Sequence, residues 1–312
     1  MLIAAGIMLA AGCSDGGGAG PGGAAPPFDV AMTTLELVDT TRPTAATQTT
    51  PGSPSRAIAT DVYYPLRDGR SPIVLLSHGL RSHPARFAHV LEALARAGYV
   101  AVAPAYPLTS SSAPDGGDHA DDVVNQPADA SFVIGEIIRL GDAREGDGGD
   151  AKAGDLAGRV DGDRVALLGS SLGAITSLGV SYGRCCRDDR IDAVISISGF
   201  LFPFPGGFDV AGVPALFIHG DRDDTIPYSL GLAAYQTAAP PKWLVTNLGG
   251  GHGIEEIGFD TADPRSDFDE FFAIVLDFLD LYARGDRAAA DRLVADGAIP
   301  GRTTLTYEES GS

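Results

Sequence analysis

Short runs of apolar residues alternate along the chain with longer segments in which apolar residues recur every three or four positions. The short runs are typical of buried β-strands, and the longer segments are typical of helices that cover them. Inner strands are predicted at residues 73–79, 99–104, 164–169, 193–198, 214–219 and 242–248. The alternating segment 57–64 predicts an early antiparallel strand at one edge of the sheet.

Helical spacing of apolar residues is found at 87–97, 129–140, 172–182 and 267–283. Strands that alternate with helices predict an α/β fold, with a mostly parallel sheet covered by helices on both faces. The chain has 312 residues, of which 44% are hydrophobic, and this suits one domain with a substantial core.

The predicted strand 164–169 runs into a Gly-x-Ser-x-Gly motif at residues 169–173, and a helical segment follows. Glycines at both ends of the motif allow a sharp turn from strand to helix, which holds Ser171 in a strained and exposed position. The motif therefore predicts that Ser171 is a nucleophile. Because the chain contains 41 glycines, an ordinary glycine-rich turn is the alternative.

A nucleophilic serine needs a base that takes its proton and a third group that orients the base. After a strand-to-helix nucleophile we expect the acid and then the histidine, each just past the end of a later strand. His252 lies in a glycine loop after strand 242–248 and is the candidate base. Asp223 is the candidate acid, because it fits the pattern His-Gly-x-x-Asp-x-x-Ile-Pro; Asp224 and Asp221 remain alternatives.

Two backbone N–H groups are expected to stabilise the oxyanion that develops when a serine attacks a carbonyl group. Leu172 directly follows the serine, and Leu80 follows a buried strand that ends in His-Gly. We expect His78 to order this loop by hydrogen bonding rather than to transfer protons. We expect His219 to pack the turn that presents the acid.

Together these motifs resemble the α/β-hydrolase superfamily, in the branch of platelet-activating-factor acetylhydrolase-like and dienelactone-hydrolase-like esterases, near bacterial cutinase-like polyester hydrolases. The resemblance is carried by residues 77–80, 169–173, 219–223, 226–227 and 251–252. It implies an α/β-hydrolase fold with an eight-stranded, mostly parallel sheet, a Ser-His-Asp triad and no cofactor. Ser171 stands where dienelactone hydrolases have cysteine, which favours ordinary ester hydrolysis.

The segment between the strand that ends near Gly199 and the strand that begins at Pro214 has only about 14 residues, too few for a large lid domain. Ser171 is therefore expected in a relatively open cleft. Phe200 and Phe202 in this segment are candidate substrate-binding residues of an acyl-binding wall. Simple core packing is an equally open alternative.

An acidic loop at 115–122 leaves the carboxyl end of a strand, where open α/β sheets bind ligands. Its aspartates and His119 raise the question of calcium, but their spacing matches no known ligand loop. A solvated acidic loop is favoured, and we expect no metal site. The adjacent Cys185 and Cys186 either form a vicinal disulfide or remain thiols.

The N-terminus resembles a bacterial lipoprotein signal, with residues 1–12 as the signal peptide and Cys13 as the lipid-modified residue. Lys and Arg are absent before Cys13, so the usual positive region is missing. Residues 13–27 are predicted to form a flexible Gly/Ala/Pro tether, and 28–284 the catalytic domain. Residues 285–312 are predicted to form a short helix, at 286–295, and a loose tail.

These features predict an exported cell-envelope lipoprotein, anchored to the membrane by lipid and monomeric. A net charge of −19 disfavours nucleic-acid binding. The predicted function is a serine ester hydrolase that acts on small to medium acyl esters through an acyl-enzyme. The alternatives are a cutinase-like polyester hydrolase and a non-catalytic binding module.

Overall fold

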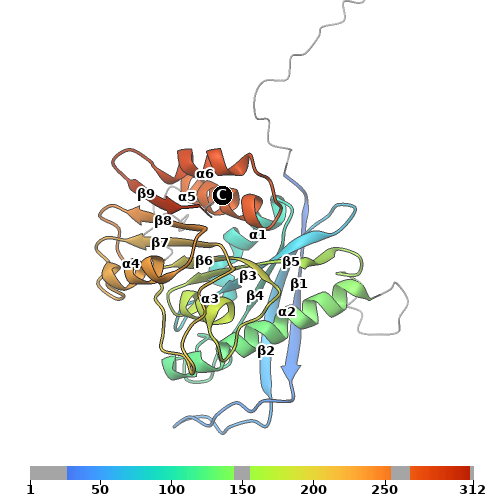
Figure 1. The fold of residues 1–312 in the computed structure, drawn as a ribbon. Helices are drawn as coiled ribbons and strands as arrows, with labels where there is room; N and C mark the ends of the chain where they lie inside the picture. Colours follow the sequence, from blue (N-terminus) through green and yellow to red (C-terminus); the bar gives the residue numbers. More distant parts are fainter. Residues whose placement is uncertain (1–26, 144–154, 254–267, 310–312) are drawn as a thin grey trace, which may run out of the picture.

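The computed structural model of the chain describes residues 27–143, 155–253 and 268–309. Within these residues a single sheet of nine strands is flanked by six α-helices (Figure 1). The strands are β1 (Val30–Asp39), β2 (Arg56–Pro65), β3 (Ser71–Ser77), β4 (Val100–Pro104), β5 (Val160–Ser170), β6 (Ile191–Ile197), β7 (Ala215–Gly220), β8 (Lys242–Asn247) and β9 (Thr303–Glu308). The helices are α1 (Ala88–Arg96), α2 (Gln126–Asp142), α3 (Leu172–Tyr182), α4 (Tyr228–Thr237), α5 (Phe268–Tyr282) and α6 (Ala289–Gly297), with short 3₁₀ turns η1 (Pro84–Phe87) and η2 (Ala120–Val124).

The strands lie side by side in the order β1-β2-β4-β3-β5-β6-β7-β8-β9. Strands β3 to β8 run parallel, whereas β1, β2 and β9 form the antiparallel pairings at the two ends of the sheet. The predicted α/β class and mostly parallel sheet are confirmed. The expected number of eight strands is wrong, because both ends of the sheet carry a strand that the sequence pattern does not predict.

At one end, the predicted edge strand 57–64 corresponds to β2, and β2 does not lie at the edge. β1 pairs with β2 along its whole length, from Val30 opposite Pro65 to Asp39 opposite Arg56. As an edge strand, β1 buries only Leu35 and Asp39 completely. Its hydrophobic alternation is correspondingly weak, which is why the sequence does not predict it.

At the other end, the C-terminal tail is not loose over residues 303–308. These residues form β9, which pairs antiparallel with β8, and the ring of Tyr307 stacks on Trp243 with centroids 4.4 Å apart. The strand is mostly polar and exposed, so it lacks the apolar run that marks the inner strands. The short helix expected at 286–295 is observed as α6, at Ala289–Gly297.

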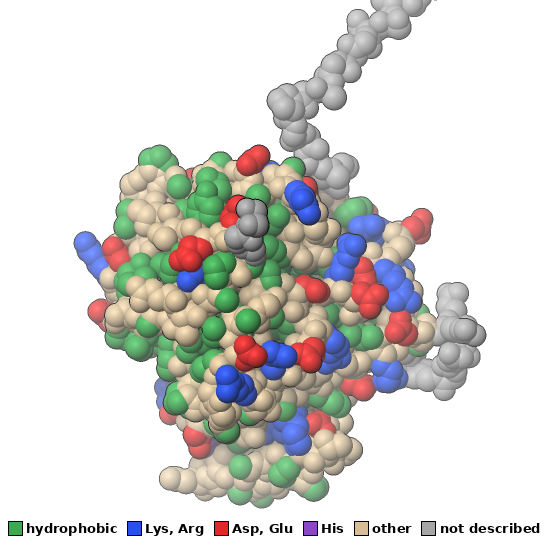
Figure 2. All heavy atoms as spheres, in the orientation of Figure 1, with side chains coloured by type: hydrophobic (Ala, Val, Ile, Leu, Met, Phe, Trp, Pro, Cys, Tyr) green, Lys and Arg blue, Asp and Glu red, His purple; other side chains and the backbone are tan. Residues whose placement is uncertain are grey.

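Helices cover both faces of the sheet, as predicted (Figure 1). Side chains of α2, α3 and α4 pack in one buried cluster, and those of α1, α5 and α6 pack in the other. The central strand β3 contributes side chains to both clusters. Ile73 and Leu75 pack in the cluster of α2, α3 and α4, and Val74 and Leu76 pack in the cluster of α1, α5 and α6. On the face drawn in Figure 2, acidic and basic side chains lie interspersed with apolar ones.

The carboxyl ends of the parallel strands meet along one edge of the sheet, because the strands point the same way. The loops after β3, β5, β6, β7 and β8 therefore gather there. Ser171, Asp223, His252 and Leu80 lie in these loops, and Leu172 begins the helix that follows Ser171. Edges of this kind are where open α/β sheets bind ligands.

Candidate active site

Ser171 occupies the turn between β5 and α3, with φ 56° and ψ −120°. Residues that have a Cβ rarely adopt such a positive φ, so the conformation is strained. The neighbouring strand holds it in place, because the Ser171 N–H donates to the carbonyl oxygen of Ile197 at 2.9 Å. The sharp strand-to-helix turn expected from the Gly-x-Ser-x-Gly motif is thus observed, whereas an ordinary turn between exposed loops is not.

The two glycines of the motif are required by close packing of the backbone. A Cβ on Gly169 would lie 2.2 Å from the carbonyl oxygen of Gly173, and a Cβ on Gly173 would lie 2.0 Å from that of Ser77. The loop after β3 also touches the nucleophile, since a Cβ on Gly79 would lie 3.3 Å from the Cβ of Ser171. The elbow and the loop after β3 are therefore packed backbone against backbone.

His252 reaches Ser171 from the loop after β8. Its Nε2 lies 2.8 Å from the Ser171 Oγ. The glycine-rich loop comes close because β7 ends in Gly220, where a Cβ would lie 2.3 Å from the carbonyl oxygen of Gly250. Ser198, the residue after β6, accepts a hydrogen bond from the Gly253 N–H at 3.3 Å and ties the loop to the sheet.

Gly220, which leaves room for the His252 loop, and Ser198, which bonds that loop, were not among the residues predicted for the site. Gly220 has a signal in the sequence, because it follows His219 at the end of an apolar run that precedes the acid. Ser198 has no such signal in the sequence. Its contact with Gly253 depends on how the strands lie side by side and on the position of the loop after β8. Contacts between distant segments of this kind need the folded sheet to be seen.

Asp223 contacts the other nitrogen of the histidine ring, with its Oδ2 2.8 Å from the His252 Nδ1. Its Oδ1 accepts the N–H groups of Thr225 and Ile226 at 2.9 and 2.8 Å. The carboxylate is inaccessible to solvent, whereas Asp221 and Asp224 are exposed. Of the three candidates, Asp223 is the one that the fold brings to the histidine.

The pKa of Asp223 follows from these contacts. Burial raises it, but the hydrogen bonds from His252 and from the backbone of Ile226 and Thr225 outweigh that effect, so the pKa lies below its ordinary value of 3.8. The carboxylate is therefore ionised near neutral pH. An ionised carboxylate beside the His252 Nδ1 keeps the proton on Nδ1, and the Nε2 is then free to accept the hydroxyl proton of Ser171.

Leu80 and Leu172, the candidate oxyanion residues, belong to the two segments that meet at the serine. Leu172 is the first residue of α3, whose amino end carries unpaired N–H groups and a partial positive charge. Leu80 directly follows Gly79, which packs against Ser171. Among the described residues no hydrogen bond from either N–H is found.

His78 orders the loop that carries Leu80. The ring is buried and its Nδ1 lies 2.8 Å from the carbonyl oxygen of Gly79, while its Nε2 accepts the N–H of Tyr106 at 3.2 Å. Burial lowers the pKa of His78 to about 4, so the ring is neutral near pH 7. Its contacts are those of a residue that shapes the loop, in line with the role expected from the sequence.

An apolar cluster adjoins the serine. Its buried members are Val123, Leu172, Ile175 and Phe204, and partly buried Leu80, Phe200, Phe202, Phe208 and Cys186 pack against them. Phe204 belongs to the core, since it lies directly on Gly179 of α3. Phe200 and Phe202 are half-exposed and share the cluster with both candidate oxyanion residues. This position is compatible both with an apolar wall beside the serine and with core packing.

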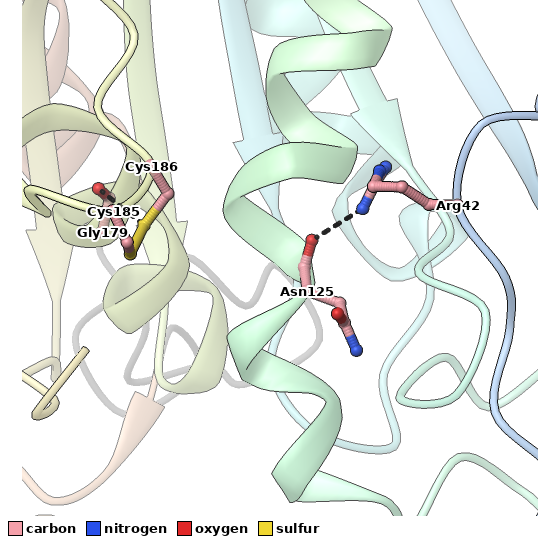
Figure 3. The surroundings of a disulfide bond; sticks show 5 residues. All are labelled: Arg42, Asn125, Gly179, Cys185 and Cys186. Atoms are coloured by element: carbon pink, nitrogen blue, oxygen red, sulfur yellow. Dashed lines mark hydrogen bonds between the residues drawn. A yellow bond between two sulfur atoms is a disulfide. The ribbon is translucent and has the colours of Figure 1, made fainter. Parts of the chain in front are cut away.

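Cys185 and Cys186 form a vicinal disulfide just after α3 (Figure 3). The Sγ of Cys186 lies 3.9 Å from the carbonyl oxygen of Gly179. The thiol alternative is therefore not what the structure shows.

Acidic residues of the loop at 115–122 have partners both inside and outside the loop, since Asp118 pairs with Arg81 and Asp122 with Arg56. Asp115 accepts hydrogen bonds from His119 at 2.7 Å and from Thr47 at 3.0 Å. In the part of the chain that the structure describes, no three His, Cys, Asp or Glu residues gather in a way that suits a metal ion.

No model of a known protein family matches the chain, and no curated protein matches it either. The predicted signal peptide at 1–12, Cys13 and the predicted tether up to residue 26 lie outside the described residues. No helix within those described is long and apolar enough to span a membrane.

Proposed function

We propose that the protein is a serine ester hydrolase of the α/β-hydrolase fold, with Ser171 as nucleophile, His252 as base and Asp223 as the orienting acid. One observation carries the proposal. Two contacts of 2.8 Å link the Asp223 carboxylate through the His252 ring to the Ser171 hydroxyl. The three residues come from loops after three different strands, and their order along the chain is the one that a strand-to-helix nucleophile requires.

In the first half of the proposed reaction, the Ser171 Oγ attacks the ester carbonyl carbon while the His252 Nε2 takes the hydroxyl proton. The negative charge of Asp223 stabilises the imidazolium that forms. The carbonyl oxygen becomes an oxyanion and accepts hydrogen bonds from the backbone N–H groups of Leu80 and Leu172. As the tetrahedral intermediate collapses, the imidazolium protonates the leaving alcohol and an acyl group remains on Ser171.

In the second half, a water molecule attacks the acyl carbonyl and His252 takes its proton. The same two N–H groups hold the second oxyanion. When this intermediate collapses, the proton returns from His252 to the Ser171 Oγ and the carboxylic acid leaves. One donor of an oxyanion site is typically worth about 100- to 1,000-fold in rate, so the two N–H groups supply a large share of the expected catalysis.

The apolar wall supports substrates with small to medium acyl groups. Phe200 and Phe202 are half-exposed beside the proposed oxyanion site, and their rings lie 6.4 Å apart. Each methylene buried there contributes about 0.8 kcal/mol. We therefore expect Phe202→Ala to lower kcat/KM for hexanoyl esters more than for acetyl esters. A nitrophenyl ester series measures this, with Leu66→Ala, an exposed apolar residue outside the cluster, as control.

The same series separates the alternative substrates. A polyester film offered beside soluble esters is expected to yield little product if the wall serves soluble acyl groups. Faster release from the film than from soluble esters would favour the cutinase-like alternative. An acyl-length dependence that is unchanged in Phe202→Ala would show that the wall does not bind the acyl group.

The primary test compares wild type with Ser171→Ala on a short-chain nitrophenyl ester. Ser170→Ala is the matched control, because Ser170 is the neighbouring residue of the same turn and is buried. We expect Ser171→Ala to fall to the background rate, a loss of about a millionfold in kcat, and Ser170→Ala to stay within about tenfold. Equal background rates in all three proteins would instead favour a non-catalytic binding module.

The proposal includes export and lipid attachment at Cys13. It is supported by the apolar segment 1–11, which is too short to span a bilayer, and by the Leu-Ala-Ala-Gly-Cys sequence that ends at Cys13. An N-terminal acyl anchor would hold a monomeric enzyme at the membrane without a spanning helix. Such an enzyme would act on esters outside the cytoplasm.

A further inference from the structure

His219 is a buried histidine that the proposed mechanism does not use. It lies next to the end of β7, and its Nε2 is 2.9 Å from the carbonyl oxygen of Ile226 and 3.2 Å from the Oδ2 of Asp223. Both neighbours are acceptors, so the Nε2 carries the hydrogen. It donates that hydrogen to the Ile226 carbonyl oxygen, and the Asp223 Oδ2 is a second, longer contact of the same N–H. Burial lowers the pKa of His219, so the ring is a neutral donor near pH 7.

The contact with His219 completes the fixing of the Asp223 carboxylate. The Oδ1 is held by two backbone N–H groups of the turn, those of Thr225 and Ile226. These two hydrogen bonds fix the Oδ1, but they do not fix the direction of the Oδ2. The His219 Nε2 lies 3.2 Å from that second oxygen, on the side of β7, so it is placed to orient the oxygen independently of the His252 loop.

Helix α4 is shaped to accept the His219 ring. A Cβ on Gly231 would lie 2.2 Å from the His219 Nδ1, so only glycine leaves room at this point of the helix. Glycine inside a helix is unfavourable compared with alanine. On another side the ring of Tyr228 packs edge-on, with centroids 5.9 Å apart. The ring is therefore confined in the orientation that aims the Nε2 at Asp223.

We propose that His219 is a positioning residue, whose Nε2–H is shared between the Ile226 carbonyl oxygen and the Asp223 Oδ2 and so keeps that carboxylate oxygen aimed at the His252 Nδ1. This inference rests on the proposed function, since it concerns the acid of the same triad. His219 touches neither substrate nor the reacting atoms. Its effect passes through Asp223, and that route makes it testable.

A double-mutant cycle tests the route. His219→Leu removes the donor and is expected to lower kcat roughly 10- to 100-fold, with KM within about twofold of wild type. This factor corresponds to the loss of one hydrogen bond to a charged group. His219→Gln retains an N–H at similar reach and should stay within about threefold of wild type. In an Asp223→Ala background, His219→Leu should add less than about a twofold loss. An equal loss in both backgrounds would overturn the proposal.

A second variant perturbs the ring from outside the triad. Gly231→Ala places a methyl group against the Nδ1, and we expect kcat to fall several-fold although alanine favours the helix. Ser229→Ala, at an exposed position of the same helix, is the control and should leave kcat unchanged. Unchanged kcat in Gly231→Ala, together with full activity of His219→Leu, would contradict a positioning role.

The last readout needs no substrate. In wild type and in His219→Gln, the proton between the His252 Nδ1 and Asp223 should give a sharp downfield ¹H resonance. In His219→Leu the resonance should broaden or move toward that of a free imidazole, and an unchanged resonance would count against the inference. If wild type hydrolyses no ester, the proposed function fails, while this spectrum still decides the role of His219.

Discussion

Two buried carboxylates in this molecule, Asp129 and Asp223, have opposite surroundings. Both side chains are inaccessible to solvent. Asp129 in α2 contacts the guanidinium groups of Arg56 at 2.6 Å and of Arg42 at 2.7 Å. Asp223 is held by N–H groups of the backbone and of histidine rings, and no Arg or Lys of the described residues forms an ion pair with it.

The difference separates a structural carboxylate from one that is available for chemistry. Two guanidinium groups neutralise Asp129, and its ion pairs fasten α2 to β2 and to the segment that follows β1. Asp223 is stabilised by neutral donors and keeps its net charge. In the proposed reaction that charge is what stabilises a positively charged His252.

Removing the charge of Asp223 should have the largest effect on rate. Asp223→Asn is expected to lower kcat by about ten-thousandfold, because His252 then loses both its preferred tautomer and its counter-charge. Steady-state kinetics on a nitrophenyl ester measure this. Asp224→Asn is the matched control at an exposed neighbouring position, and it should change kcat by less than about twofold. Comparable losses in both variants would remove the distinction between the two carboxylates.

Removing the charge of Asp129 should act on stability instead. Asp129→Asn leaves buried Arg56 with Asp122 as its one ionic partner among the described residues, and breaking a buried ion pair typically costs about 3–5 kcal/mol. Denaturant unfolding measures the loss in free energy of unfolding. At a temperature where the variant is folded, its kcat should stay close to that of wild type. A loss of kcat as large as in Asp223→Asn would contradict the comparison.

The pH dependence of stability offers a smaller test. Because the pKa of Asp223 in the folded protein lies below 3.8, its charge contributes stability above that value, and the contribution is lost as the pH falls through the folded pKa. Asp223→Asn lacks this contribution. The difference in Tm between wild type and Asp223→Asn should therefore narrow below pH 3.8. A constant difference from about pH 6 to about pH 2.5 would show that the native contacts do not stabilise the charged form.

The features that depend on local chemistry could be predicted from the sequence. The inner strands are nearly continuous apolar runs because both faces are buried, and the glycines at 169 and 173 mark the turn around Ser171. Since the parallel strands end at one edge, the order serine, aspartate, histidine also implied that the three side chains meet. The contacts of His252 with Ser171 and Asp223 agree with that expectation.

The features that depend on the fold could not be predicted. β1 and β9 are edge strands with weak apolar patterns, and they are recognised only by their partners β2 and β8. Helix α4 has little separation of polar and apolar faces, so its pattern does not predict a helix. It also contains Gly231, a residue that disfavours helices, and the reason for this glycine is its contact with the His219 ring. The sequence suggested that His219 packs the turn, but its contact with Asp223 depends on the three-dimensional arrangement.

The central claim is that Ser171 becomes acylated, and trapping the acyl-enzyme tests it most directly. Wild-type protein is mixed with a short-chain nitrophenyl ester, quenched in acid within the first turnover and examined by peptide mass spectrometry. We predict one acyl group, on the peptide that contains Ser171, and none in Ser171→Ala. Ester turnover with no acyl group on Ser171, or with the acyl group on another residue, would contradict the account.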